Sequence, residues 1–131
     1  IRDTSVTGVQ TCALPILIDK ITILQIKQDE FSDEVKLANV RKELRELNKL
    51  AAELNVNVVK EMSELRKVNA IIWANEDDAR QFPSDNWTAV DAFDIATIAM
   101  ATYEANTRRA QIKKQINEKC GSNIVEEKSY T

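Results

Sequence analysis

The chain has 131 residues, with 18 basic and 21 acidic side chains, a formal net charge of −3 and no histidine. An acidic chain without a basic stripe argues against nucleic-acid binding, and no apolar run approaches the roughly 20 residues that a membrane-spanning helix needs. The lack of histidine removes the commonest general base and zinc ligand, so we expect neither a bound metal nor a cofactor.

The first sixteen residues, IRDTSVTGVQTCALPI, read like a translated short-read sequencing adapter. They indicate an artefact of metagenome assembly, and we set residues 1–16 aside as non-native, as one does with a cloning scar. The alternative is a native strand and turn around Gly8 and Pro15. Residues 17–131 then form a single helical domain, a length that suits one core.

The composition of this domain predicts its class and its compartment. Its only cysteine, glycine and proline are Cys120, Gly121 and Pro83. A lone cysteine cannot form an internal disulfide, which favours a reducing cytoplasm. So little glycine and proline argues against a turn-rich β fold.

The first predicted helix covers residues 17–27 and is apolar around much of its circumference, which is typical of a central helix. A strand stays the alternative there, because short apolar runs rich in Ile and Thr are ambiguous. Ser32 is expected to cap the second helix, residues 33–54. That helix repeats apolar residues at alternating steps of three and four, the a/d seam of a bundle or short coiled coil. We therefore expect that a protein partner or a homo-oligomer uses the second helix.

The segment Asn55-Val56-Asn57 interrupts good helix formers and predicts a break, although one bent helix through this segment is the alternative. The third helix is expected over 58–82, ended by Pro83. Within it, NAIIWANEDDAR places an amide, a carboxylate and a guanidinium beside Trp73.

The fourth helix is expected from about Thr88 to Lys119. Thr88 and Asp91 resemble a capping box at its start, and Gly121 supplies a cap at its end. The last residues are expected to dock as an extended arm. The predicted fold is thus all-α, a four-helix up-down bundle with an extended C-terminal arm.

Folding these helices back on one another brings polar residues into one layer. The register places Asp19 and Lys20 level with Asn69 and Tyr103, and a mixed cluster there is our candidate ligand-binding site. Its members come from the first, third and fourth helices and from the tail: Asp19, Lys20, Asn69, Tyr103, Asn106, Arg109, Lys113, Glu126, Glu127 and Lys128. No catalytic residue is identified.

Two carboxylate pairs, Glu43 with Glu46 and Glu61 with Glu64, have the one-turn spacing with which some all-α pyrophosphohydrolases hold Mg²⁺. Those enzymes also need a second acidic pair, for which Asp91 and Asp94 are the only nearby candidates. Because glutamate is abundant in this chain, chance explains the spacing well. Cys120 next to a helix C-terminus is a poor nucleophile, since the helix dipole disfavours the thiolate there.

The stretches LIDKITILQIK, NAIIWANEDDAR, YEANTRRAQIKKQIN and GSNIVEEKSY together resemble an uncharacterised bacterial helical family, a domain of unknown function. The family is encoded in some genomes near glycosyltransferases and tetratricopeptide proteins. The resemblance covers residues 17–131 and implies a small helical cytoplasmic protein without an assigned activity. The chain departs from the family pattern at Ile16, where a Glu is expected, and at Thr107, where an Asp is expected. Both departures remove a carboxylate and weaken any acid–base or metal role that rests on it.

Two functions follow from these observations. The first is a non-enzymatic binding or accessory module linked to cell-surface glycan assembly. The second is a small ligand-binding protein or enzyme acting on an anionic substrate, phosphorylated or a nucleotide sugar, held by Lys20, Arg109 and Lys113.

Overall fold

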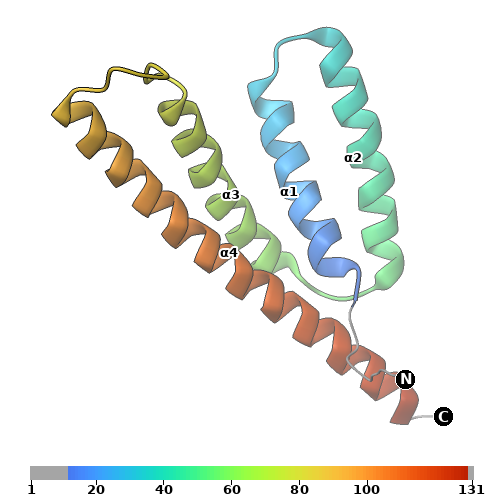
Figure 1. Ribbon diagram of the computed structural model, residues 1–131. Coiled ribbons are helices and arrows are strands. Elements are labelled where there is room, and N and C mark those ends of the chain that lie inside the picture. Colours follow the sequence, from blue (N-terminus) through green and yellow to red (C-terminus); the bar gives the residue numbers. More distant parts are fainter. Residues whose placement is uncertain (1–11, 130–131) are drawn as a thin grey trace, which may run out of the picture.

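The computed structural model describes residues 12–129, and the surroundings of their side chains up to Gly121. It contains four helices, α1 (Leu14–Glu30), α2 (Glu34–Leu54), α3 (Val59–Ala79) and α4 (Ala89–Ser129). The helices alternate in direction along the chain (Figure 1), and residues 12–129 contain no strand. The predicted all-α up-down bundle is therefore confirmed.

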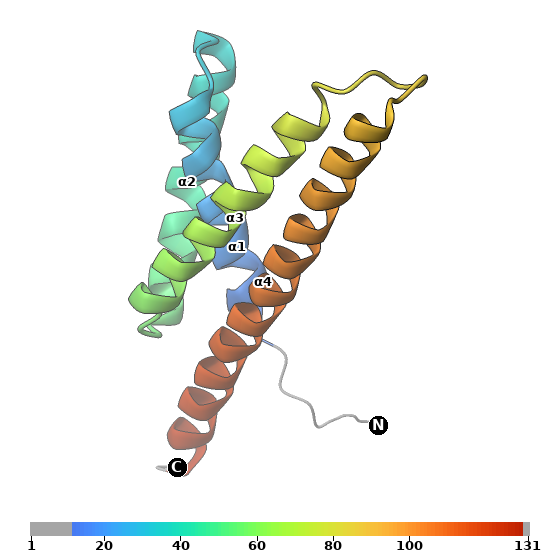
Figure 2. The same ribbon diagram turned by 90° about the vertical axis from the view of Figure 1, so that its left-hand side faces the viewer.

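The four helices form two hairpins, α1–α2 and α3–α4. Helix α1 is the part of the first hairpin that packs against the second. Helix α1 packs against each of the other three, whereas α2 packs against α1 alone within the described residues, and α3 packs along α4. The two hairpins diverge toward the end of the molecule that holds the α1–α2 and α3–α4 connections (Figures 1 and 2). The hydrophobic core lies where α1 crosses the α3–α4 hairpin.

Aliphatic side chains fill this crossing. Ile21 of α1, Leu65 of α3, and Ile112 and Ile116 of α4 are fully buried. Burying one such side chain contributes about 1.5–3 kcal/mol. Because α1 contacts helices on several sides, it needs apolar residues around much of its circumference, as its sequence predicts.

Most of the apolar seam of α2 packs against other parts of the same chain. Leu37 and Val40 are buried, and Leu44 and Leu47 pack against the core. Leu50, toward the end of the seam, is half-exposed. Association through the second helix stays a prediction, because much of the seam already faces α1.

The starts of α2, α3 and α4 and the end of α2 lie within one residue of the predicted boundaries, whereas α1 extends three residues further at each end and α3 ends at Ala79 instead of residue 82. Helix α2 ends at Leu54, and its C-cap Asn55 adopts the left-handed conformation with φ 51°, so the predicted break is confirmed. Thr88 and Asp91 form the expected reciprocal capping box at the start of α4. The prediction for α2 was wrong by one residue: the cap is Asp33, whose carboxylate accepts hydrogen bonds from the backbone amides of Val35 and Lys36.

The predicted helix stop at Gly121 and the extended arm beyond it were wrong. Helix α4 continues to Ser129, and Gly121 has no positive φ. A glycine inside a helix costs only about 1 kcal/mol relative to alanine, a penalty that neighbouring helical residues offset.

Residues 12–16, which the sequence analysis set aside, take part in this structure. Cys12 forms a disulfide with Cys120, and Leu14 is buried in the core. The expectation of an unpaired cysteine was therefore wrong, because it came from a count that left out Cys12. The non-native origin of residues 1–16 stays a prediction. None of the helices within residues 12–129 has the length and apolar character to cross a membrane.

Candidate functional site

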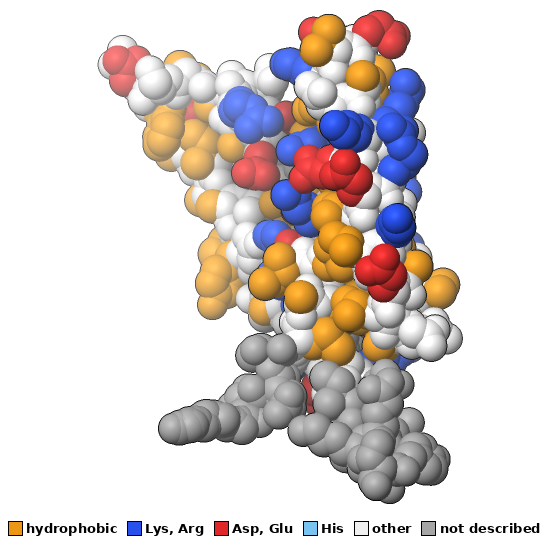
Figure 3. All heavy atoms as spheres, turned by 90° about the vertical axis from the view of Figure 1, so that its right-hand side faces the viewer, with side chains coloured by type: hydrophobic (Ala, Val, Ile, Leu, Met, Phe, Trp, Pro, Cys, Tyr) orange, Lys and Arg blue, Asp and Glu red, His pale blue; other side chains and the backbone are white. Residues whose placement is uncertain are grey.

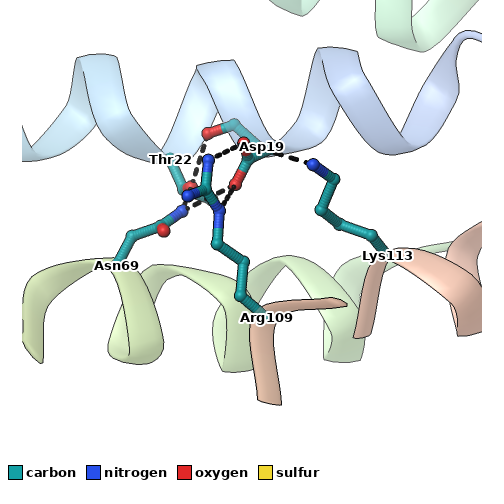
Figure 4. A network of polar contacts seen from close by, with 5 residues as sticks. All are labelled: Asp19, Thr22, Asn69, Arg109 and Lys113. Atoms are coloured by element: carbon teal, nitrogen blue, oxygen red, sulfur yellow. Dashed lines mark hydrogen bonds and ion pairs between the residues drawn. The ribbon is translucent and has the colours of Figure 1, made fainter. Parts of the chain in front are cut away.

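A buried carboxylate, Asp19, lies at the crossing of α1 with the α3–α4 hairpin and gathers polar side chains from all three helices (Figure 4). Asn69 of α3 donates a hydrogen bond from Nδ2 to Asp19 Oδ1 at 3.0 Å and to Thr22 Oγ1 at 2.8 Å. The Thr22 hydroxyl in turn donates to the backbone carbonyl of Asp19 at 2.8 Å. Asp19, Thr22 and Asn69 are all buried, so the hydrogen bonds compensate for the water these groups lose.

Two cations of α4 complete this group, which we call the Asp19 cluster (Asp19, Thr22, Asn69, Arg109 and Lys113). The guanidinium of Arg109 donates from Nε to Oδ1 at 2.9 Å and from Nη2 to Oδ2 at 2.5 Å. This two-pronged geometry matches the planar carboxylate. Lys113 Nζ lies 3.9 Å from Oδ2. Each Asp19 oxygen therefore already has at least one partner within the protein.

The proton affinities follow from this geometry. Burial by itself raises the pKa of Asp19, but hydrogen bonds from Arg109 and Asn69, together with the charges of Arg109 and Lys113, outweigh it and leave the pKa below its ordinary value. The hydrogen bond to Asp19 raises the pKa of Arg109 against the opposing effect of burial, with further help from the charges of Asp19 and Glu76. Asp19 is consequently a stable anion and a weak base, unsuited to proton abstraction near neutral pH.

The structure brings together four of the predicted site residues: Asp19, Asn69, Arg109 and Lys113. Thr22 was missed, although its place one turn after Asp19 on the same helix face was readable from the sequence. Its small side chain gave no other signal.

The remaining predicted residues lie elsewhere or beyond what is described. Lys20 pairs with Glu43 of α2 at 2.7 Å and is exposed. Tyr103 is 70% exposed, and Asn106 is exposed. Within the described residues neither has a hydrogen bond to the Asp19 cluster. The side chains of Glu126, Glu127 and Lys128 lie outside the described residues.

The register of α4 explains the misplacement of Tyr103. The predicted levels of α1 and α3 agree with the contact of Asp19 with Asn69. Arg109, rather than Tyr103, occupies the place on α4 that faces Asp19. The register count assigns levels along the chain only, and it does not include the divergence of the two hairpins (Figure 2).

The carboxylates with metal-binding spacing on α3 are engaged by cations of α4. Glu61 is buried and lies 2.9 Å from Lys119 Nζ, and Glu64 lies 3.0 Å from Arg108. Burial raises the pKa of Glu61, but hydrogen bonding and the charge of Lys119 hold it below its ordinary value. Among residues 12–121 there is no group of three or more potential metal ligands.

A groove of about 790 Å³ opens where α1 and α3 begin and α2 ends. Its lining combines apolar side chains with side-chain amides, a hydroxyl and one guanidinium: Leu14, Ile18, Gln25, Asn48, Ala51, Ala52, Asn55, Val56, Asn57, Val58, Val59, Met62, Ser63 and Arg66. Arg66 is partly engaged, because it donates to Asp29 at 2.6 Å and to Gln25 at 3.3 Å. Among residues 12–121, no carboxylate, thiol or phenol lines the groove. On the face over α1 and α2, hydrophobic side chains gather in the lower part and charged ones above them (Figure 3).

The chain belongs to a family of unknown function, DUF6165, whose match extends over residues 11–131. The match takes in the last six residues of the segment that was set aside as non-native. No curated protein and no solved structure matches the chain.

Proposed function

We propose that this chain is a non-enzymatic binding module whose partner occupies the groove between α1, α2 and α3. The observation that carries the proposal is the chemistry of the groove lining. Its volume of about 790 Å³ is in the range of ligand sites, which are mostly apolar with a few polar groups that fix orientation. The lining offers no carboxylate, thiol or phenol that could serve as an acid, base or activated nucleophile.

The Asp19 cluster also supports this proposal, because its cations are already engaged within the protein. A site for an anionic substrate needs cations that are free to meet it. Arg109 donates its paired hydrogen bonds to Asp19, and Lys113 lies beside the same carboxylate. The cluster therefore acts as an internal tie that fixes α1 on the α3–α4 hairpin.

The chemistry of the groove indicates the kind of partner. Apolar side chains such as Met62 and Val56 line the groove together with the amides of Asn48, Asn55 and Asn57. Amides pair with backbone N–H and C=O groups, while the apolar lining accepts apolar side chains. A peptide segment of a protein partner meets both requirements.

Cell-surface glycan assembly is our proposed setting, supported by the family resemblance and by no individual residue. A cytoplasmic location belongs to the same proposal. The disulfide between Cys12 and Cys120 counts against that location, because such bonds are reduced in most cytoplasms.

The groove is tested with the fluorescent probe 8-anilinonaphthalene-1-sulfonate, which brightens in apolar sites. We expect saturable binding that Ala52→Trp abolishes, because the indole fills the groove. The matched control is Ala38→Trp, an exposed alanine of the same helix outside the groove lining, which should bind like the parent chain. Absence of saturable binding, or equal loss in both variants, contradicts the proposal.

The competing reading, an anionic-ligand protein, is tested by thermal shift with UDP-glucose, ATP and inorganic phosphate. We expect no stabilisation by any of them. A saturable rise in melting temperature that Lys113→Ala removes would favour the anionic-ligand reading and overturn the binding module.

A further inference from the structure

The first half of α4 exposes large apolar side chains on the face turned away from α3. Phe93 is 72% exposed, Met100 61% and Tyr103 70%. A run of nine residues between Asp94 and Glu104 carries no charge. A helix in water normally places charged and polar groups on such a face, so this surface lacks a partner within the described chain.

The spacing on this face is that of a helix-pairing seam. Its positions follow one another at alternating steps of four and three residues: Ala89, Phe93, Ala96, Met100, Tyr103 and Thr107. This is an a/d pattern, which packs against another helix with side chains inserted between those of the partner. We call these six positions the α4 seam.

We propose that the α4 seam binds the same seam of a second copy of this chain, antiparallel and related by a two-fold axis near residue 98. In that register Ala96 lies opposite Met100 of the other copy, so that each small side chain receives a large one. Phe93 lies opposite Tyr103 of the other copy, which forms an aromatic pair on each side of the axis. Because the same contacts occur twice, the surface is self-complementary, as a two-fold interface requires.

The distribution of charge selects this partner and this direction. Acidic residues gather at the α3–α4 tip and the start of α4, among them Asp85, Asp91 and Asp94, while basic residues such as Lys114 follow the seam. Lys114 continues the seam at seven residues beyond Thr107. An antiparallel pair brings the acidic tip of one copy beside Lys114 of the other, whereas a parallel pair would place acid against acid.

The area that the α4 seam can bury indicates the expected affinity of the dimer. Aromatic side chains bury about 150–250 Å² each, and two copies of the seam bury on the order of 1,000 Å² in total. This lies at the lower limit of specific interfaces. The dimer should therefore dissociate reversibly, with a dissociation constant on the order of 1–100 μM. The inference is independent of the proposed groove, which lies on α1, α2 and α3.

Sedimentation velocity of the full chain between about 1 and 300 μM tests the dimer, since it should show a concentration-dependent shift from monomer to dimer. Met100→Asp should weaken association at least tenfold, because it places a carboxylate at the centre of the seam. The control is Val35→Asp on α2, where the parent side chain is 72% exposed against 61% for Met100, and it should associate like the parent chain. Circular dichroism verifies that both variants are folded. A parent chain that stays monomeric throughout, or an equal effect of both variants, overturns the proposal.

Photo-crosslinking tests the direction. A benzoylphenylalanine at position 103 in isotopically heavy chains, mixed with light chains, should crosslink to the part of the light chain around Phe93. Phe93 and Tyr103 share one tryptic peptide, so the crosslinked chains are digested before aspartate, which cuts between Phe93 and Asp94 and separates the two positions. A crosslink to the light peptide that contains Tyr103 would overturn the antiparallel arrangement. As a second readout, Lys114→Glu should weaken association several-fold, and adding Asp85→Lys should restore it.

Discussion

The ion pair between Asp19 and Arg109 should contribute to the free energy of unfolding and to its pH dependence. Replacing Arg109 by Met keeps most of the aliphatic length and removes the charge and the paired donors. Asp19, whose side chain is 9% exposed, then keeps only Asn69 and the more distant Lys113. Breaking a buried ion pair by removing one partner costs about 3–5 kcal/mol. Because the Arg109 side chain is 29% exposed, water compensates part of this, and we expect a loss of about 2–3 kcal/mol.

The pH dependence of stability should reverse its sign. In the parent chain the pKa of Asp19 is below its ordinary value, so the folded state binds this proton less readily than the unfolded state. The stability that Asp19 contributes is therefore present above the unfolded pKa and is lost as the pH falls through the folded pKa. In Arg109→Met, burial is no longer outweighed, and the pKa of Asp19 should rise above its unfolded value. That variant should gain stability as the pH falls from about 6 toward 4, and its deficit against the parent chain should shrink.

Urea unfolding of the parent chain, Arg109→Met, Asp19→Asn and the double variant, at several pH values from 4 to 7, gives the coupling energy of the pair directly. Arg109→Lys is the matched control, because it retains the charge without the two-pronged geometry and should cost less than Arg109→Met. A deficit in Arg109→Met below about 0.5 kcal/mol that does not change with pH would refute the reasoning, since surface pairs behave in that way.

Three further predictions concern single features of the fold. The Nδ2 atom of Asn75 is buried and has no hydrogen-bond partner among the described residues, so Asn75→Leu should stabilise the chain by about 1 kcal/mol in urea unfolding. The exposed control Asn39→Leu should change the stability by less than about 0.5 kcal/mol, and destabilisation by Asn75→Leu would mean that the amide has a polar role. Thr88→Ala removes one half of the α4 capping box and should cost about 1 kcal/mol, while Thr88→Ser should cost little; equal losses would show that the cap does not contribute. The disulfide between Cys12 and Cys120 joins residues 108 apart, so its reduction should lower the free energy of unfolding by about 2–4 kcal/mol. Detection of free thiols by mass spectrometry, in the chain purified without reductant, would contradict the pairing.

The amino-acid sequence determined the helices of this protein because their signals are local. The step pattern of Leu37, Val40 and Leu44, the left-handed Asn55 and the Thr88–Asp91 box each depend on residues within a few turns of one another. Where the local signal was ambiguous, sequence reasoning failed. Gly121 is compatible both with a helix end and with a helix interior, and the structure places it inside α4.

The tertiary structure alone decided which side chains meet. Asp19 and Arg109 are 90 residues apart in sequence and share a hydrogen bond. Whether Arg109 or Tyr103 faces Asp19 depends on the angle between hairpins, which is set by the packing of side chains such as Ile21, Leu65 and Ile112. The angle between two hairpins cannot be read from the periodicity of apolar residues in any one helix. The sequence indicated a polar cluster, but only the packing showed that its carboxylate, Asp19, is already paired with Arg109 and lies 3.9 Å from Lys113.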